Sequence, residues 1–372
     1  MSHTSTSLAG LPLLLLFGIM GCDAQPSHRP SDAAATNIAA KSGPAGTAEA
    51  GDPLEGRSPS GAGDLMRAVV VSEFGSPDVL RIETVPRPIP APDELLVRVH
   101  AAGVNPVDAI VRRGNWGLSL PLVPGFDLSG VVEQVGSGVG EFRIGDEVFA
   151  MLDLRRPGSY AEYAVVKVEE AARKPSGTSH AEAASLPLVA LTGWQALFER
   201  ADLQPGQTVL IHAGAGGVGS IAIQLARWKG ATVIATASEH NHDFLRELGA
   251  DQVIDYRTQR FEDVARDIDV ILDPIGGETQ DRSLGVLKEG GILVSLGGLT
   301  PAARTPDRNL RAVSMLVRPD SVQLRRIAEL VEDGSVRPIV THLLPLEDAP
   351  DAHIQSETGR TRGKIVLHVA GG

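Results

Sequence analysis

The sequence has little cysteine, few aromatic residues and no excess of positive charge. Cysteine occurs once in 372 residues, at Cys22, which excludes an intramolecular disulfide and a cysteine-rich structural zinc site. The 34 Lys and Arg are outnumbered by 46 Asp and Glu, the formal net charge is -12, and no basic stretch is present. Because nucleic-acid binding requires clustered Lys and Arg, nucleic acid is disfavoured as the main partner and a small molecule is favoured.

The N-terminal apolar run, residues 11–20, is too short to span a bilayer comfortably. It ends in Ile-Met-Gly-Cys, which resembles a bacterial lipoprotein signal with Cys22 as the lipidated residue. We therefore expect a possible signal peptide at residues 1–22 and a disordered linker rich in Ala, Gly, Pro and Ser at 23–65. Residues 1–10 contain no Lys or Arg, however, so a translation start at Met66 is the alternative. A chain with lipidated Cys22 would be a membrane-anchored lipoprotein, and a chain that starts at Met66 would be cytoplasmic.

A glycine-rich turn follows an apolar run in the middle of the chain. Residues 208–220 read as a strand, a turn with four glycines and the start of a helix that ends at Gly230. Such glycines let the backbone approach a ligand, and the helix N-terminus favours negative charge, so we predict a pyrophosphate site. A glycine cluster alone would also fit an ordinary turn. The residues predicted to contact the pyrophosphate are Gly214, Gly216, Gly217, Val218 and Gly219.

Two periodicities divide the rest of the sequence. Residues 66–189 contain short strands between Pro- and Gly-containing turns, which predict a compact antiparallel barrel with strands at 68–73, 80–85, 94–101, 128–135 and 147–149. Residues 190–314 alternate strands with helices, which predicts a parallel sheet with a ligand at the carboxyl ends of its strands. Its strands are expected at 208–213, 232–237, 252–255, 270–273 and 291–296, with helices at 244–248 and 280–288. Residues 315–372, with helices near 323–331 and 346–356, are predicted to return to the first domain.

Several motifs occur together in a fixed order. They are Ala-Gly-Val-Asn-Pro-Val-Asp at 102–108, Pro-Gly-Phe-Asp-Leu-Ser-Gly at 124–130, Val-Gly-Ser-Gly-Val-Gly at 135–140, Gly-Asp-Glu-Val at 145–148, Gly-Ser-Tyr-Ala-Glu-Tyr at 158–163 and Gly-Lys-Ile-Val-Leu at 363–367. From about residue 66 onward the chain resembles the medium-chain dehydrogenase/reductase superfamily, more narrowly its zinc-independent, zeta-crystallin-like quinone oxidoreductase branch. The resemblance implies an α/β protein with a GroES-like β-barrel catalytic domain, a Rossmann-type nucleotide-binding domain and a homodimer.

The metal ligands of zinc-dependent relatives are missing. Those relatives place a cysteine near the position of Asn105 and a Gly-His-Glu triplet where this chain has Gly125, Phe126 and Asp127. Catalytic zinc needs three protein ligands and an open position, which these residues do not supply, so we predict no metal. Scattered histidines such as His100 are expected to be core or surface residues.

The cofactor is predicted to be NADP(H). Ser238 lies 19 residues beyond Gly219, where an NAD enzyme normally carries Asp or Glu at the ribose 2′ oxygen. A carboxylate ~4 Å from a 2′-phosphate would cost about 4 kcal/mol per charge pair at an effective dielectric constant of 20, whereas serine carries no such penalty. The resemblance adds Tyr256 as a 2′-phosphate contact. Relatives often carry a lysine shortly after the serine, where this chain has His240 and Asn241.

Further residues are expected near the nicotinamide and the substrate. Thr192 resembles the family's threonine beside the nicotinamide, and Ser295 ends a predicted strand where backbone groups usually meet the ring. Lys364 or Arg362 is expected to reach cofactor phosphates, although a solvated basic turn is the alternative for these two. Asn105 is the candidate that polarises or orients the substrate carbonyl, and Asp108 is the second catalytic candidate, expected to brace that loop. No strong general acid is evident, so the proton is expected to come from solvent.

These observations predict an NADPH-dependent, zinc-independent oxidoreductase with its active site between the two domains. It would transfer a hydride to a quinone or an α,β-unsaturated carbonyl compound. An enoyl-thioester reductase of the same superfamily and a nucleotide-binding module without turnover remain alternatives. A lipid-anchored protein with a degenerate nucleotide domain is a further one, because cytosolic NADPH would not reach an exported domain.

Overall fold

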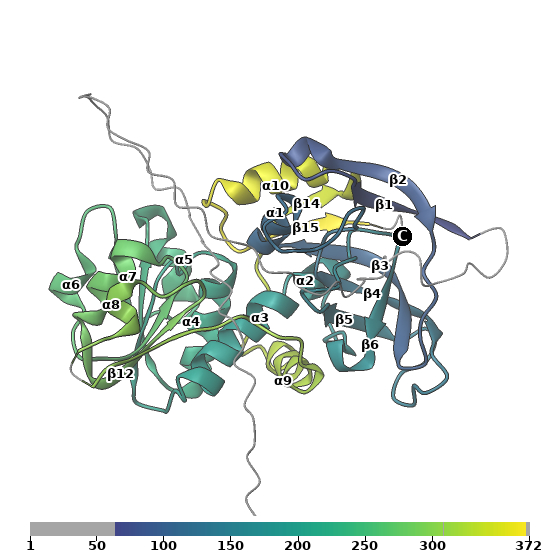
Figure 1. The fold of residues 1–372 in the computed structure, drawn as a ribbon. Coiled ribbons are helices and arrows are strands. Elements are labelled where there is room, and N and C mark those ends of the chain that lie inside the picture. The colour runs from purple at the N-terminus through teal and green to yellow at the C-terminus, as the bar shows by residue number, and fades with distance from the viewer. Residues whose placement is uncertain (1–63, 308, 370–372) are drawn as a thin grey trace, which may run out of the picture.

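The computed structural model describes residues 64–307 and 309–369, which form two domains, each built on its own main sheet (Figure 1). The predicted signal peptide, Cys22 and all of the predicted linker except residues 64 and 65 lie outside the described residues. No helix in residues 64–307 or 309–369 is both long enough and apolar enough to cross a membrane.

The first domain contains a seven-stranded sheet in the order β14-β15-β3-β4-β5-β7, with β6 also paired to β3. Its pairs are antiparallel except for the parallel pair β14 and β15, and β1 and β2 form a separate antiparallel hairpin. The predicted GroES-like barrel is confirmed, while the short strands β6 and β7 were not predicted. The strands are β1 (Leu65–Val71), β2 (Leu80–Pro86), β3 (Glu94–Val104), β4 (Asp127–Val135), β5 (Glu147–Met151), β6 (Tyr163–Lys167), β7 (Ala171–Arg173), β14 (Val340–Pro345) and β15 (Lys364–His368).

The second domain is the predicted Rossmann-type domain, with an entirely parallel six-stranded sheet in the order β10-β9-β8-β11-β12-β13. The central strand β8 is apolar along most of its length because it is covered on both faces, and Val209, Leu210 and Ile211 are fully buried. The strands are β8 (Thr208–Ile211), β9 (Thr232–Ala237), β10 (Gln252–Asp255), β11 (Ile268–Asp273), β12 (Leu287–Ser295) and β13 (Arg311–Ser314).

Helices cover both sheets and join the domains. In Figure 1, α3 and α9 lie between the barrel and the nucleotide-binding domain. The α-helices are α1 (Pro106–Arg112), α2 (His180–Ala184), α3 (Pro187–Trp194), α4 (Gly217–Lys229), α5 (His242–Glu247), α6 (Phe261–Val264), α7 (Gly277–Leu284), α8 (Pro301–Arg304), α9 (Ser321–Glu332) and α10 (Ala349–Glu357). The other helical turns are η1 (Pro77–Val79), η2 (Val168–Glu170), η3 (Gln195–Arg200), η4 (Glu239–Asn241) and η5 (Leu346–Asp348).

Of two predicted helix ends, one is confirmed and the other is wrong. The predicted stop of the helix after the glycine turn is confirmed, because α4 ends at Lys229 and Gly230 adopts the left-handed conformation, with φ 85°. The helix predicted at 280–288 is wrong beyond Leu284, where α7 ends and β12 begins at Leu287. Leu287 is buried and pairs with Ile268, so packing against β11 outweighs the local helical pattern.

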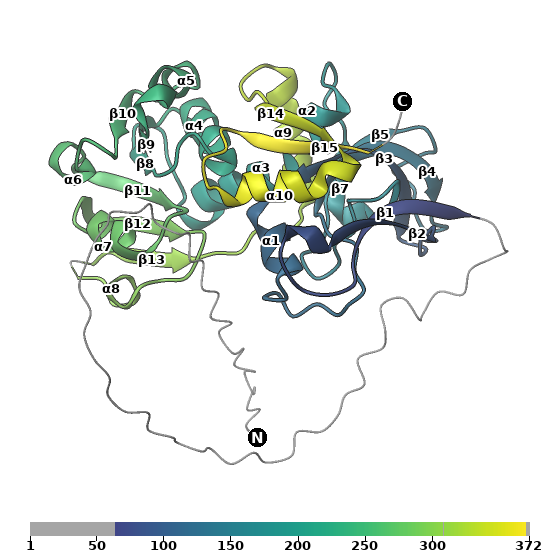
Figure 2. The same cartoon turned by 90° about the horizontal axis from the view of Figure 1, so that it is seen from above.

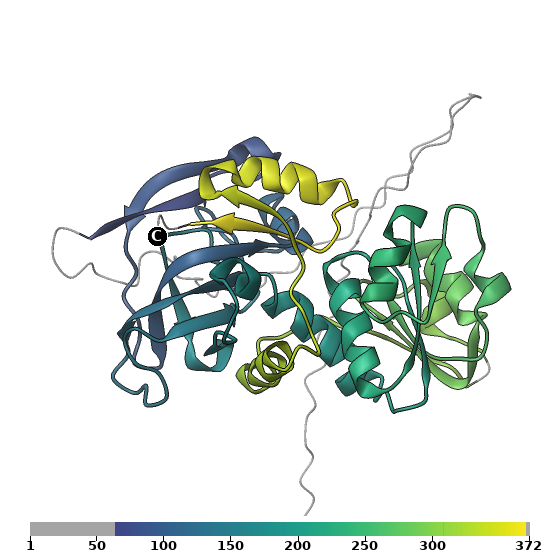
Figure 3. The same cartoon turned by 180° about the vertical axis from the view of Figure 1, so that it is seen from behind.

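The C-terminal segment returns to the barrel after the nucleotide-binding domain. Figure 3 shows this segment, in yellow, crossing from the second domain to the first, and Figure 2 shows α10 and β15 side by side. The strand β15 pairs antiparallel with β3, with Ile365 opposite Val104. The residues just before β15 therefore lie at the junction of the two domains.

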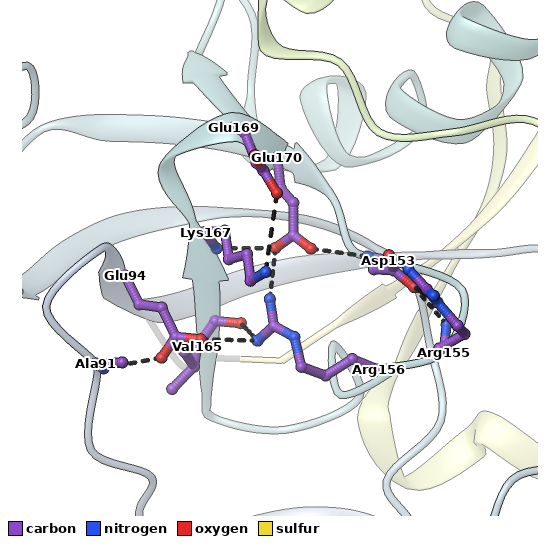
Figure 4. Close-up of polar contacts among 9 residues, drawn as sticks. All are labelled: Ala91, Glu94, Asp153, Arg155, Arg156, Val165, Lys167, Glu169 and Glu170. Atoms are coloured by element: carbon purple, nitrogen blue, oxygen red, sulfur yellow. Dashed lines mark hydrogen bonds and ion pairs between the residues drawn. The ribbon is translucent and has the colours of Figure 1, made fainter. Parts of the chain in front are cut away.

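A buried charge cluster stabilises one end of the barrel (Figure 4). The Arg156 guanidinium lies 2.8 Å from Glu170 Oε2 and 3.5 Å from Glu94 Oε1, and it donates to the carbonyl of Val165. The Glu170 carboxylate also accepts the backbone N–H groups of Lys167 and Asp153. Burial raises the pKa of Glu170, and the positive charge of Arg156 opposes that rise.

We predict that Arg156→Met lowers the free energy of unfolding by about 2 kcal/mol at pH 7.5, because a buried carboxylate loses its partner. The loss should shrink at pH 5. A carboxyl whose pKa is raised in the folded state stabilises the fold below its unfolded pKa and loses that contribution as pH rises through its folded pKa. Urea unfolding at both pH values measures the effect, with the exposed neighbour Arg155→Met as the matched control. Equal losses for the two variants would contradict the prediction.

Candidate functional site

The glycine turn places its glycines in structurally different positions. A Cβ on Gly214 would lie 2.6 Å from the Leu245 side chain, and one on Gly219 would lie 2.4 Å from the Ala213 carbonyl oxygen. A Cβ on Gly216, the N-cap of α4, would meet only that same oxygen, at an ordinary contact distance of 3.4 Å. Gly214 and Gly219 are thus required by protein packing, whereas Gly216 leaves open space at the start of a 13-residue helix. That space is where an anionic group could approach the backbone.

Ser238 lies directly after β9 and is part of a polar cluster. Its Oγ accepts a hydrogen bond from Asn241 Nδ2 at 3.3 Å. Arg362 joins the cluster from the C-terminal segment: its Nε donates to Asn241 Oδ1 at 2.8 Å and its Nη2 to the His240 carbonyl at 3.2 Å. The neighbouring Glu239 is exposed, as expected of a solvated residue. A positive charge therefore stands at the predicted ribose end of the site, where the family's usual lysine is missing.

Other residues predicted to contact the cofactor lie at the carboxyl ends of the strands of the same sheet. Tyr256 follows β10, which pairs with β9, and the residue is 58% exposed. Ser295 ends β12, and its Oγ is 3.0 Å from Gln280 Nε2, which also donates to Asp273 Oδ2 at 2.8 Å. Asp273 Oδ1 accepts two backbone N–H groups of the loop after β11. Asp273 thus fixes the loop after β11, and Gln280 links it to Ser295 at the end of β12. The roles of Tyr256 and Ser295 stay predictions.

The segment before β15 runs along the glycine turn. The Gly363 N–H donates to the Ala215 carbonyl at 2.9 Å, and Gly363 forms a parallel bridge with Gly216. Gly363 has φ 58°, and a Cβ there would lie 2.5 Å from the Ile339 carbonyl oxygen, so glycine is required for this approach. The barrel's last strand is thereby attached to the nucleotide-binding domain.

Lys364 contacts Asn105, the residue predicted to bind the substrate carbonyl. Its buried Nζ donates to the Val104 carbonyl at 2.7 Å and to Asn105 Oδ1 at 2.5 Å, and it lies 3.6 Å from Asp127 Oδ2. Burial lowers the pKa of Lys364, and the carboxylate of Asp127 opposes this change. The sequence placed Lys364 among the phosphate contacts, whereas its ammonium group is directed toward Asn105. A phosphate contact for Lys364 stays a prediction.

Asp127 joins three elements at this point, and the sequence analysis did not assign it to the site. Its Oδ2 accepts from Asn105 Nδ2 at 2.8 Å, and its Oδ1 accepts from the backbone N–H of Leu188, near the start of α3, at 2.8 Å. Thr192 lies one turn further along α3 and donates to the Leu188 carbonyl. The sequence did contain a signal for Asp127: it stands beside Phe126, in the triplet where zinc-dependent relatives carry metal ligands.

Asp108 ends a directional chain of buried hydrogen bonds. Arg112 Nη1, which can only donate, lies 3.0 Å from His353 Nδ1, so His353 carries its hydrogen on Nε2, 3.4 Å from the Tyr160 oxygen. Tyr160 in turn donates to Asp108 Oδ2 at 2.9 Å, and the Asn105 backbone N–H donates to the same oxygen at 2.7 Å. Burial raises the pKa of Asp108 to about 7. These bonds brace the loop that carries Asn105, and neither Tyr160 nor His353 was assigned a role from the sequence.

Metal-ligating side chains do not gather in the described part of the chain. Across residues 64–307 and 309–369, no three His, Cys, Asp or Glu side chains form a group that could hold a metal ion. The rings of His100 and His180 stack at 4.4 Å between centroids, and His180 Nδ1 lies 2.8 Å from Ser129 Oγ.

Comparisons with known proteins agree with this geometry. Residues 91–176 match the family described as "Alcohol dehydrogenase GroES-like domain", and residues 248–367 match the family described as "Zinc-binding dehydrogenase". The chain is 37% identical over 318 residues to the 2-methylene-furan-3-one reductase of Solanum lycopersicum and to the NADPH-dependent alkenal/one oxidoreductase of Arabidopsis thaliana, which covers 82% of this chain and 79% of each relative. The quinone oxidoreductase structure from Coxiella burnetii is 36% identical, with a TM-score of 0.77, over 82% of this chain and 100% of that one.

Proposed function

The chain belongs to the medium-chain dehydrogenase/reductase superfamily, and from that premise we propose that it is an NADPH-dependent, zinc-independent oxidoreductase that reduces a quinone or an α,β-unsaturated carbonyl compound. One observation carries the proposal. Three consecutive residues, Arg362, Gly363 and Lys364, contact the ribose end, the glycine turn and Asn105 in that order. A single extended ligand along this segment would meet all three parts of the site.

The residues present fit NADPH. The helix α4 offers its N-terminus and the open space beside Gly216 to a pyrophosphate, and Gly217, Val218 and Gly219 continue that first turn. At the ribose end, Ser238 carries no charge and Arg362 supplies a positive one, which suits a 2′-phosphate better than a 2′-hydroxyl. When bound, the cofactor supplies the hydride that reduces the substrate.

The chain's own residues bind and polarise the substrate. Asn105 is the proposed donor to the carbonyl oxygen, on which negative charge develops during reduction. Asp108 braces the Asn105 loop through its bond to the Asn105 backbone. We assign the proton that completes the reduction to solvent.

The test of the proposal is oxidation of NADPH and of NADH by the full 372-residue chain with quinones, enones and 2-enoyl thioesters as acceptors. We expect NADPH to be preferred and quinones or enones to be reduced. A strong preference for the thioesters would favour an enoyl-thioester reductase. Tight NADPH binding without turnover of any acceptor would favour a nucleotide-binding module and would end the reductase proposal.

We predict that Asn105→Ala lowers kcat/KM for an enone by about 10- to 100-fold, because the developing oxyanion loses its donor. The dissociation constant for NADPH, measured by fluorescence titration, should stay within about twofold, since Asn105 acts on the substrate. Asn105 precedes α1, and the exposed Asn115 follows α1, so Asn115→Ala is the control variant. A matching loss in both variants would remove Asn105 from its proposed role.

The proposal extends to assembly and to the limits of the domains. We propose a homodimer of chains with a catalytic domain at 66–189, an NADP-binding domain at 190–314 and a C-terminal return at 315–372, and membrane attachment only through lipid on Cys22. Light scattering tests the dimer. Metabolic lipid labelling with N-terminal sequencing distinguishes lipidated Cys22 from a start at Met66.

A further inference from the structure

The side chain of Asn105 lies between a cation and an anion whose hydrogen-bonding roles are fixed. Lys364 Nζ is 2.5 Å from Asn105 Oδ1, and Asp127 Oδ2 is 2.8 Å from Asn105 Nδ2. An ammonium group only donates, and an ionised carboxylate only accepts. The two neighbours therefore set which end of the amide is oxygen and which is nitrogen, an assignment that otherwise depends on the surrounding network.

The ionised forms of both neighbours suit their surroundings. Both oxygens of Asp127 face donors: the Leu188 N–H, the Asn105 amide and, at 3.6 Å, the Lys364 ammonium. Burial raises the pKa of Asp127 and lowers that of Lys364, and each charge opposes the change in the other. Asp108 is the further carboxyl group whose charge acts on Lys364, and Tyr160 donates to it.

One hydrogen of the Asn105 amide is left over. Asn105 is 1% exposed, its Oδ1 accepts from Lys364, and one of its two Nδ2 hydrogens is donated to Asp127. Within the residues that the structure describes, no acceptor takes the second hydrogen. A buried donor hydrogen without an acceptor is unfavourable until a ligand brings one. A carbonyl oxygen is such an acceptor.

We propose that Lys364 and Asp127 are positioning residues that fix the Asn105 amide so that its remaining N–H binds the substrate carbonyl oxygen. The proposal rests on the function proposed above, because it needs a carbonyl-bearing substrate. The pair thus orients the donor, and Lys364 acts through Asn105.

The lysine itself is held by the nucleotide-binding domain. Its stem passes over the start of α4, where a Cβ on Gly217 would lie 3.1 Å from Lys364 Cδ. The preceding residue, Gly363, is bonded to the glycine turn. The position of Lys364, and with it the orientation of Asn105, therefore depends on the same turn that is proposed to bind the pyrophosphate.

Lys364→Met in the full-length chain tests the proposal. We expect kcat for an enone to fall by about 10- to 100-fold, while the dissociation constant for NADPH changes by less than about twofold. Lys364→Arg, which keeps the charge and the donors, should recover part of kcat. The control is Lys174→Met, a second lysine with a buried stem, which pairs with Glu147 in the barrel and should leave kcat unchanged. Asp127→Asn gives a second variant should Lys364→Met fail to fold.

The same substitution in an Asn105→Ala background separates positioning from a structural role. If Lys364 acts through Asn105, its loss should lower kcat by less than about twofold in that background. Equal losses with and without Asn105 would overturn the proposal. So would a weakened affinity for NADPH with an unchanged kcat at saturation, which would make Lys364 a phosphate ligand. A wild-type chain that reduces no carbonyl compound would instead refute the proposed function.

Discussion

Gly219→Ala is expected to lower the free energy of unfolding by about 3 kcal/mol, whereas Gly216→Ala should leave it within about 0.5 kcal/mol of the wild type. The difference follows from what each new Cβ would meet. At Gly219 the Cβ would lie 2.4 Å from the Ala213 carbonyl oxygen and 2.8 Å from Gly214 Cα, and both are backbone atoms that cannot move independently of the turn. At Gly216 the single neighbour is 3.4 Å away, and φ is −75°, which any residue adopts.

Affinity for NADPH should nevertheless fall in both variants, by about 100-fold or more at Gly219 and about 10-fold at Gly216. The Gly219 loss comes from a distorted turn. We expect the Gly216 loss to come from a methyl group in the space where the pyrophosphate is proposed to approach, in a chain that is otherwise folded as the wild type is. Thermal unfolding without cofactor and fluorescence titration with NADPH measure the two effects separately. An unchanged affinity in Gly216→Ala would contradict the proposed pyrophosphate site, and an unchanged stability in Gly219→Ala would contradict the packing argument.

The local part of the site could be predicted from sequence because its signals are local. The strand β8, the turn and α4 occupy one continuous stretch, and the left-handed end of α4 at Gly230 follows from the conformational freedom of glycine. Ser238 was located by counting along one strand-helix-strand unit. Each of these positions depends on residues within about 20 positions of the turn, the range over which the βαβ pattern is regular.

The rest of the site depends on contacts between segments that are distant in sequence. Lys364 reaches Asn105 across 259 residues, and Arg362 reaches Asn241 across 121. No periodicity in the sequence reports such a contact, because it arises only when β15 pairs with β3 and carries the preceding residues to the domain junction. The phosphate contact expected of Lys364 from the sequence did not indicate that its ammonium group faces the amide of Asn105.

The C-terminal segment both supplies a strand of the barrel and contacts the nucleotide-binding domain. Gly363 is bonded to the glycine turn, and the residues on either side of it contact the predicted ribose end and the predicted catalytic residue Asn105.

Arg362→Gln should reduce the affinity for NADPH by about 100-fold and leave the affinity for NADH nearly unchanged. A guanidinium ~4 Å from a phosphate is worth up to about 4 kcal/mol at an effective dielectric constant of 20, and partial exposure of Arg362 reduces this to about 2 to 3 kcal/mol. NADH has no 2′-phosphate and loses none of it. Glutamine can still reach Asn241, so the polar cluster around Ser238 is retained and only the charge is removed.

Fluorescence titration with both cofactors at two salt concentrations measures this prediction. The loss for NADPH should be smaller at high salt, because the interaction with a partly exposed arginine is screened. Arg337→Gln is the matched control, since Arg337 also lies in the C-terminal part of the chain but pairs with Glu247 at the surface. If Arg362→Gln weakened NADPH and NADH equally, Arg362 would hold the domain junction rather than recognise the 2′-phosphate. The preference for NADPH would then rest on Ser238 and Tyr256.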